Sequence, residues 1–237
     1  MISVKGIKKF FTAKRLIFIA LFVIFAFITQ RINFSALVGA ENQFFTLFQF
    51  FGPIAGAFLG PIVGVIAVFL AEATDFFVVG KELTWINIVR LVPMLFATYY
   101  FATNKKSLNI IIPLLSILIF ILHPIGRTVW FFTLFWTIPI LLKIIPQKYS
   151  NTVPAKSLGA TFTAHSVGGA LWIWTIPMTA QMWINLIPIV AYERLLFALG
   201  IGISYIGINY LLDFVLNKFK IDVKEVLKID KKFTLKA

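Results

Sequence analysis

Apolar residues fill long runs of this chain, and polar residues gather in the short stretches between them. The runs lack the residue-by-residue alternation that the strands of a membrane barrel require, so they predict helices. Proline, glycine and charged residues divide them into eight predicted spans, at residues 16–30, 43–59, 61–79, 85–103, 108–122, 126–143, 158–177 and 187–215. We predict an all-α, polytopic membrane protein with six to eight transmembrane helices, because lipid leaves no water to satisfy irregular backbone.

Composition places the whole chain in this class. Hydrophobic residues make up 60% of the sequence and charged residues 13%, whereas soluble domains average about 25% charged residues. The sequence contains no cysteine, which excludes disulfides and thiolate chemistry. We expect a basic N-terminal segment at 1–15, one transmembrane domain at 16–216 and a lysine-rich tail at 217–237.

The net charge of +13 follows the predicted topology. With the N-terminus in the cytoplasm, the lysines of the first segment, of two loops and of the tail all fall on the cytoplasmic side. The other side keeps Arg31, Lys81 and Arg127. This is the positive-inside bias of a cell-membrane protein. We therefore predict cytoplasmic termini and a plasma-membrane location in contact with the lipid bilayer, and no nucleic-acid partner.

Charged and aromatic residues gather in the outer halves of the predicted spans. Glu72 and Asp75 are three residues apart, so they share a helical face, and charged groups inside a membrane are costly and commonly functional. The topology brings them to the same depth as other polar and aromatic residues, which predicts an outward-facing pocket for a small solute. The predicted substrate-binding residues are Glu72, Asp75, Arg90, Arg127, Trp172, Trp174, Asn185 and Glu193.

Structural roles compete with binding at several of these positions. Glu72 or Asp75 would serve equally well to pair with Arg90 and lock two helices together. Tryptophans at this depth commonly form an interfacial belt, an interpretation that suits Trp85 and Trp183 best. His165 lies among small residues and is more typical of a hydrogen bond between packed helices than of a ligand contact.

Known catalytic patterns are missing from the sequence. It contains no P-loop ending in Lys-Ser or Lys-Thr, no His-Glu-x-x-His and no Gly-x-Ser-x-Gly. The two histidines, His123 and His165, fall at opposite predicted depths and make a poor metal site. We expect a protein that is not an enzyme, with no metal and no cofactor.

Four glycines recur at every fourth position around the break between the second and third predicted spans, at Gly52, Gly56, Gly60 and Gly64. A bare stripe of this kind lets helices approach closely in lipid. We predict that it forms the rigid stem of a helix hairpin or a partner-docking face.

The stretch from Leu47 to Asp75 resembles the second and third helices of the substrate-binding (S) components of energy-coupling factor transporters. The resemblance rests on Phe58-Leu59-Gly60-Pro61 followed by Gly64, Ala67, Ala71 and Glu72. A weaker similarity lies in the last span, where Ile187-Pro188 opens a helix rich in small residues. Together the matching positions cover a small part of the chain.

The resemblance implies a subunit that captures a vitamin or related micronutrient outside the cell. It also implies two kinds of partner, a coupling membrane subunit and cytoplasmic ATPase subunits, which would account for the missing P-loop. The chain departs from the family in its eight predicted spans, where six are common. It also lacks the N-terminal histidine expected of a metal-specific member, so nickel and cobalt are poor substrate candidates.

From these observations we predict a membrane-embedded substrate-capture subunit of a vitamin or micronutrient importer. Mixed charges and tryptophans favour a zwitterionic or heteroaromatic solute. The alternatives are an accessory subunit of a membrane complex, a secondary transporter, and an intramembrane enzyme that would use Glu72, Asp75, His123 or His165 for acid–base chemistry.

Overall fold

The computed structural model describes residues 12–223 and 226–234, so most of the predicted N-terminal segment, residues 1–11, lies outside the described part. The described helices of five residues or more are α2 (Ala13–Thr29), α4 (Ala55–Leu59), α5 (Pro61–Val78), α6 (Trp85–Val89), α7 (Pro93–Ala102), α8 (Lys106–Leu122), α9 (Pro124–Thr128), α10 (Thr137–Ile144), α12 (Val153–Thr175) and α13 (Ala180–Lys218). Shorter turns of helix are α3 (Phe48–Phe51), α11 (Gln147–Ser150), η1 (Gly52–Ile54), η2 (Trp130–Trp136) and η3 (Lys231–Phe233). The predicted helical fold is therefore confirmed.

Local sequence explains where the main helices begin. Thr12, Thr152 and Thr179 cap α2, α12 and α13, each accepting a hydrogen bond from a backbone N–H three residues along. Proline occupies the first turn of α5 and α7, where its missing N–H costs no hydrogen bond. Gly60 ends α4 and begins α5 with a φ of 87°, a conformation that glycine adopts without strain.

Three predicted spans are interrupted in the structure. The 43–59 span consists of a strand, α3, η1 and α4. The 85–103 span breaks between α6 and Pro93, and the 126–143 span divides into α9, η2 and α10. Gly52-Pro53 and Pro93 stand at the breaks in the first two spans, where proline removes a backbone hydrogen bond and ends the continuous helix.

Three described helical stretches are long and apolar enough to cross a membrane: Pro61–Val78, Trp85–Ala102 and Ala180–Lys218. Shorter apolar stretches occupy Phe48–Leu59, Lys106–Leu122 and Trp130–Ile144. The predicted count of six to eight crossings goes beyond these three stretches and stays a prediction.

A small β-hairpin replaces the loop predicted at 31–42 and the start of the next span. Strand β1 (Asn33–Ala36) pairs antiparallel with β2 (Phe44–Thr46). The connecting turn uses positive φ angles at Gly39 and Asn42, residue types that tolerate this conformation. The hairpin is the one departure from the all-α prediction among the described residues.

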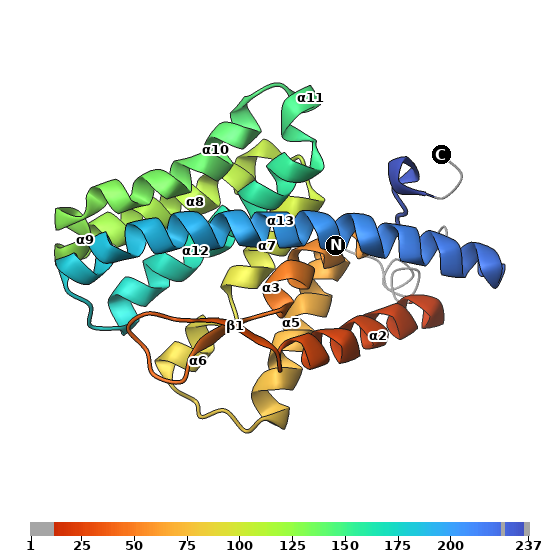
Figure 1. The fold of residues 1–237 in the computed structure, drawn as a ribbon, viewed down its shortest axis with the longest axis horizontal. Helices are drawn as coiled ribbons and strands as arrows, with labels where there is room; N and C mark the ends of the chain where they lie inside the picture. Colours follow the sequence, from red (N-terminus) through yellow and green to blue (C-terminus); the bar gives the residue numbers. More distant parts are fainter. Residues whose placement is uncertain (1–11, 224–225, 235–237) are drawn as a thin grey trace, which may run out of the picture.

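Helix α12 lies at the centre of the packing and contacts α7, α8, α10 and α13. Figure 1 shows α8, α10, α12 and α13 extending along the long dimension of the molecule, with α5, α6 and the hairpin to one side. Small residues allow the close contacts around α12: a Cβ on Gly169 would lie 2.6 Å from the ring of Trp136. This arrangement brings the middle of α12 opposite the end of α5 that carries the predicted acids.

The four glycines of the predicted docking stripe are buried inside the chain. A Cβ on Gly64 would overlap the backbone of Gly56, so α4 and α5 meet backbone to backbone. Gly52 packs against Met94 and Phe48, and Gly56 against α7. The stripe thus builds an intramolecular stem, and the prediction that it offers these glycines to a partner is corrected accordingly.

The predicted tail folds back onto the helices. Val223, Val226 and Leu227 are buried, and the Lys228 backbone N–H donates to the Phe58 carbonyl at 2.8 Å. On α13, the Asn209 side chain bonds the backbone of Asp230 in both directions and also donates to the Phe233 carbonyl. We call residues 219–234 the C-terminal segment; residues 224–225 lie outside the described part.

Candidate functional site

A cavity of about 550 Å³ lies between the hairpin, the end of α5, α6, α12 and the first half of α13. Its volume falls in the range of small-molecule sites, about 300–1,000 Å³. Five of the eight predicted binding residues line it: Glu72, Asp75, Arg90, Trp172 and Glu193.

Three predicted residues lie outside the cavity. Arg127 is exposed on α9, and Asn185 is exposed and accepts a hydrogen bond from Gln181. Trp174 is 56% exposed, donates to the Ile119 carbonyl and packs edge-on against His123. Trp172 and Trp174 are two residues apart on α12, which turns their side chains to different sides of the helix. The prediction of these three as lining residues is therefore corrected.

Asp75 forms ion pairs with two cations that also line the cavity. Arg31, just beyond α2, forms an ion pair with one carboxylate oxygen, and Lys81, in the turn after α5, contacts the other at 2.5 Å. Burial, followed by the proximity of Arg90, lowers the pKa of Lys81 below its ordinary value. The expected pairing of Asp75 with Arg90 does not occur.

Glu72 lies one turn before Asp75 and has a different environment. Its carboxylate accepts a long hydrogen bond of 3.4 Å from the Gln30 amide. Among the described residues, no cation lies within ion-pair distance of it. Glu72 therefore keeps most of its hydrogen-bonding capacity for the cavity.

Among the described residues, no acidic group lies within ion-pair distance of Arg90 either. Its guanidinium donates to the Phe44 carbonyl of β2 at 2.6 Å, which ties the hairpin to the end of α6. Arg90 can make several further hydrogen bonds, since a guanidinium carries five N–H donors. One acid and one base thus line the same cavity without forming a salt bridge.

Glu193 and Arg194 pair with each other on α13, at 3.3 Å. The Arg194 guanidinium stacks on Phe45 of the hairpin and on Phe197, at 4.7 and 4.5 Å from the ring centroids. Phe34 and Phe45 also contact Phe197, so an aromatic cluster joins the hairpin to α13. The hairpin is held at one side of the cavity by Arg90 and at the other by Arg194.

Sequence reasoning missed several lining residues. Trp183, assigned to the interfacial belt, is 2% exposed and lines the cavity with Trp172. His165 also lines it, and its Nδ1 accepts a hydrogen bond from the Trp136 indole at 3.1 Å. Gln30 and residues of the hairpin also line the cavity, beside Glu72 and Arg90. Gly39 and Asn42 are residue types that favour turns, so the sequence contained a signal for the hairpin. It contained no signal for the burial of Trp183, which depends on how the helices pack.

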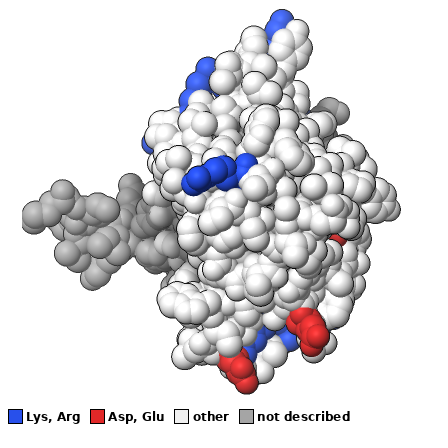
Figure 2. Space-filling view, turned by 90° about the vertical axis from the view of Figure 1, so that its left-hand side faces the viewer, with Lys and Arg blue, Asp and Glu red and all other residues white. Residues whose placement is uncertain are grey.

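Figure 2 shows the end of the molecule where α9 lies. Most of this face carries neither acidic nor basic side chains, and most of the acidic atoms in view lie at its lower edge beside Lys or Arg atoms. Within the described residues, no three histidine, aspartate or glutamate side chains are grouped so that they could hold a metal ion. The side chains that line the cavity are therefore charged groups, amides and aromatic rings, without a cluster of metal ligands.

Comparison with known proteins finds one relative of similar sequence. Over 159 residues the chain is 29% identical to the uncharacterized protein MJ0923 of Methanocaldococcus jannaschii. The match covers 60% of this chain and 53% of the relative, so the chain spans about half of that protein's length. No family model matches the chain. No solved structure matches it either.

Proposed function

We propose that this chain is the membrane-embedded substrate-capture subunit of a micronutrient importer, and that its cavity binds a small zwitterionic solute. The observation that carries the proposal is the pair Glu72 and Arg90. Both line one cavity, and neither has a partner of opposite charge within ion-pair distance among the described residues.

The neighbouring charges make this pair distinctive. Asp75 is neutralised by Arg31 and Lys81, and Glu193 by Arg194. A charged group away from bulk water is costly unless it is paired and hydrogen-bonded. A ligand carrying an ammonium for Glu72 and a carboxylate for Arg90 would supply both missing partners.

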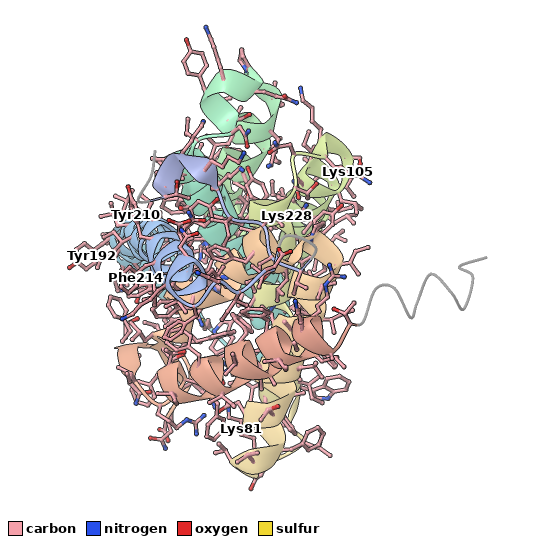
Figure 3. All side chains as sticks on the ribbon, turned by 90° about the vertical axis from the view of Figure 1, so that its right-hand side faces the viewer. Lys81, Lys105, Tyr192, Tyr210, Phe214 and Lys228 are labelled. Carbon is pink, nitrogen blue, oxygen red and sulfur yellow. The ribbon has the colours of Figure 1, made fainter. Side chains whose placement is uncertain are left out.

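Exposed residues of α13 support a membrane setting for the cavity. Tyr192, Leu195, Leu199, Ile203, Tyr210 and Phe214 are all exposed large apolar or aromatic residues. Figure 3 looks along α13 and shows Tyr192, Tyr210 and Phe214 on the same outer side of it. The two tyrosines lie about 27 Å apart along the axis at 1.5 Å per residue, close to the ~30 Å hydrocarbon core. Aromatic residues at both ends of an apolar stripe are typical of a lipid-facing helix.

We extend this setting to the whole chain as six to eight crossings of the plasma membrane, with both ends in the cytoplasm. The distribution of lysine and arginine supports this orientation.

The energy for transport would come from partners, a coupling membrane subunit and cytoplasmic ATPase subunits. The sequence resemblance around Gly60-Pro61 and Glu72 supports this, together with the missing P-loop motif. In this proposal the chain itself binds and releases the solute without chemical change, so it needs neither cofactor nor catalytic residue.

Binding measurements on purified protein test the proposal. Mass spectrometry of molecules retained through purification identifies the solute, and calorimetric titration of that solute gives its Kd. Glu72→Gln and Arg90→Ala should each weaken binding at least tenfold, equivalent to about 1.4 kcal/mol. Arg127→Ala is the matched control, because Arg127 is an exposed arginine outside the cavity.

Two outcomes would contradict the proposal. Wild-type affinity in both cavity variants would remove Glu72 and Arg90 from the site. Stable co-purification with a large complex that is not a transporter, without any bound small molecule, would favour an accessory role.

A further inference from the structure

Hydrogen-bond donors without acceptors lie on the side of the cavity formed by α12 and α13. The indole Nε1 of Trp183 is buried with no hydrogen-bond partner among the described residues, and so is Nε of Arg194. Both residues line the cavity. Indole and guanidinium nitrogens only donate, so each of these groups lacks an acceptor.

His165 adds a third donor because of its contact with Trp136. The Trp136 indole N–H donates to His165 Nδ1, so Nδ1 carries a lone pair and no proton. The proton of the neutral ring then resides on Nε2, which makes this atom a donor. No hydrogen bond involving His165 Nε2 occurs among the described residues, and His165 lines the cavity.

Trp136 holds this tautomer from a rigid position. It is fully buried, and Gly169 of α12 leaves the space that its ring occupies. Its ring also packs edge-on against Phe120 and Phe132. Rotation of Trp136 away from His165 would break these contacts, so the packing fixes which imidazole nitrogen donates.

Phe132 packs against both His165 and Trp183. The Phe132 ring centroid is 5.6 Å from that of His165 and 5.0 Å from that of Trp183. Leaving a buried donor without an acceptor destabilises the protein, because the donor loses its hydrogen bonds to water without replacing them. Phe132, His165 and Trp183 all line the cavity, so a flat ligand packed against this wall would lie near both donors, and ring atoms with lone pairs would supply the acceptors that they lack.

We infer that the α12–α13 wall binds an aromatic ring that carries hydrogen-bond acceptors at its edge, with the Trp136–His165 contact setting that preference. This rests on the proposed function, in which the ammonium and carboxylate of the same solute face Glu72 and Arg90. Rings whose edge presents an N–H are disfavoured, because donor would meet donor.

Three amino acids with the same zwitterionic head test the inference. They are 3-quinolinylalanine, whose ring nitrogen accepts, 2-naphthylalanine, whose ring neither accepts nor donates, and tryptophan, whose ring donates. Equilibrium dialysis of the purified protein, with empty detergent micelles subtracted, gives the three affinities. We expect quinolinylalanine to bind at least tenfold more tightly than either of the others.

The three ligands separate the two proposals. If all three bind equally, or naphthylalanine or tryptophan binds best, and Glu72→Gln weakens all of them, then the proposed function stands and the acceptor preference is overturned. If none of the three binds, the inference fails, and titration of the solute retained through purification decides the proposed function separately. If binding ignores both Glu72→Gln and Arg90→Ala, the proposed function fails and the inference fails with it.

Trp136→Phe tests how the preference is set. Removing the indole N–H should reduce the quinolinylalanine preference over naphthylalanine at least threefold, while the exposed Trp130→Phe control keeps it. An unchanged preference in folded Trp136→Phe protein would remove Trp136 from this role.

A spectroscopic measurement covers the case in which Trp136→Phe fails to fold. The sequence has two histidines, so ¹⁵N NMR of otherwise wild-type His123→Asn protein reports on His165 alone. We expect the Nε2–H tautomer. An Nδ1–H tautomer or a doubly protonated ring at neutral pH would overturn the inference.

Discussion

The two ends of α5 differ in what they contact: the first packs tightly within the chain, and the second borders the cavity. At its start, Gly64 packs against the backbone of Gly56, and the contact is complete within the chain. At its other end, Glu72 lines a cavity, and no cation among the described residues lies within ion-pair distance of it. The comparison teaches that the stem contact is completed by the chain itself, whereas Glu72, two turns further along, is the acid that the proposed function pairs with a ligand.

The largest effect should come from filling the stem. In Gly64→Val the new side chain would overlap the Gly56 backbone, which neither helix can relieve without separating. Overpacking costs about 1–3 kcal/mol where side chains can adjust, and we expect more here because backbone is the obstacle. Size-exclusion chromatography and thermal unfolding should show little folded monomer. A folded protein with wild-type Tm would show that the stem contact is loose.

Asp75→Asn should lower stability, while Glu72→Gln should chiefly lower affinity. Asp75 is an anion shared by Arg31 and Lys81, so neutralising it leaves two cations facing each other. Because both cations are partly exposed, we expect a loss of about 1–3 kcal/mol rather than the full cost of a buried pair. Thermal unfolding of the two variants, each paired with a binding measurement, checks the contrast. Equal Tm values and equal affinities would erase the difference between the two acids.

Asn209→Leu should release the C-terminal segment without disturbing the cavity. The buried amide makes three hydrogen bonds to Asp230 and Phe233, each worth about 0.5–1.5 kcal/mol. Limited trypsin digestion should cut faster at Lys228, Lys231 and Lys232, while ligand affinity stays unchanged. Wild-type digestion rates would show that the remaining contacts, the burial of Val223, Val226 and Leu227 and the hydrogen bonds of Lys228 and Asp230 to Phe58 and Tyr205, suffice to hold the segment.

Gly207→Ala should have the smallest effect and serves as the control for the stem. Gly207 is on α13, and a Cβ there would meet nothing within 4 Å. Alanine is favoured over glycine in a helix by about 1 kcal/mol, so Tm should stay the same or rise slightly. A marked loss of Tm would mean that glycine substitutions are harmful in this protein wherever they occur, and the Gly64 result would lose its meaning.

The sequence predicted best what depends on local patterns. The observed α5 (Pro61–Val78) agrees within one residue with the predicted 61–79 span, because a proline starts it and a glycine precedes that proline. The shared face of Glu72 and Asp75 followed from helical spacing, and both residues line the cavity. Predictions that depend on which face of a helix meets its neighbour were less accurate, as Arg127, Trp174 and Asn185 lie outside the cavity.

The tryptophans show the limit clearly. From the sequence, Trp172 and Trp174 were equally good binding candidates, and Trp85 and Trp183 equally good candidates for the interfacial belt. In the structure, Trp172 and Trp183 line the cavity, whereas Trp85 and Trp174 are largely exposed. All four are apolar residues at similar predicted depth. The direction in which α12 and α13 face each other decides among them, and no local pattern encodes that direction.

By itself, the sequence determined the helical class, the apolar runs, the start of α5 and the one-turn spacing of its two acids. These features depend on hydrophobicity, on backbone stereochemistry and on residues a few positions apart. Tertiary structure alone decided that Arg31, Lys81 and Asp75 meet, that the hairpin closes one side of the cavity and that Trp136 orients His165. Those contacts join distant segments, and their free energy depends on packing that exists only once the helices have assembled.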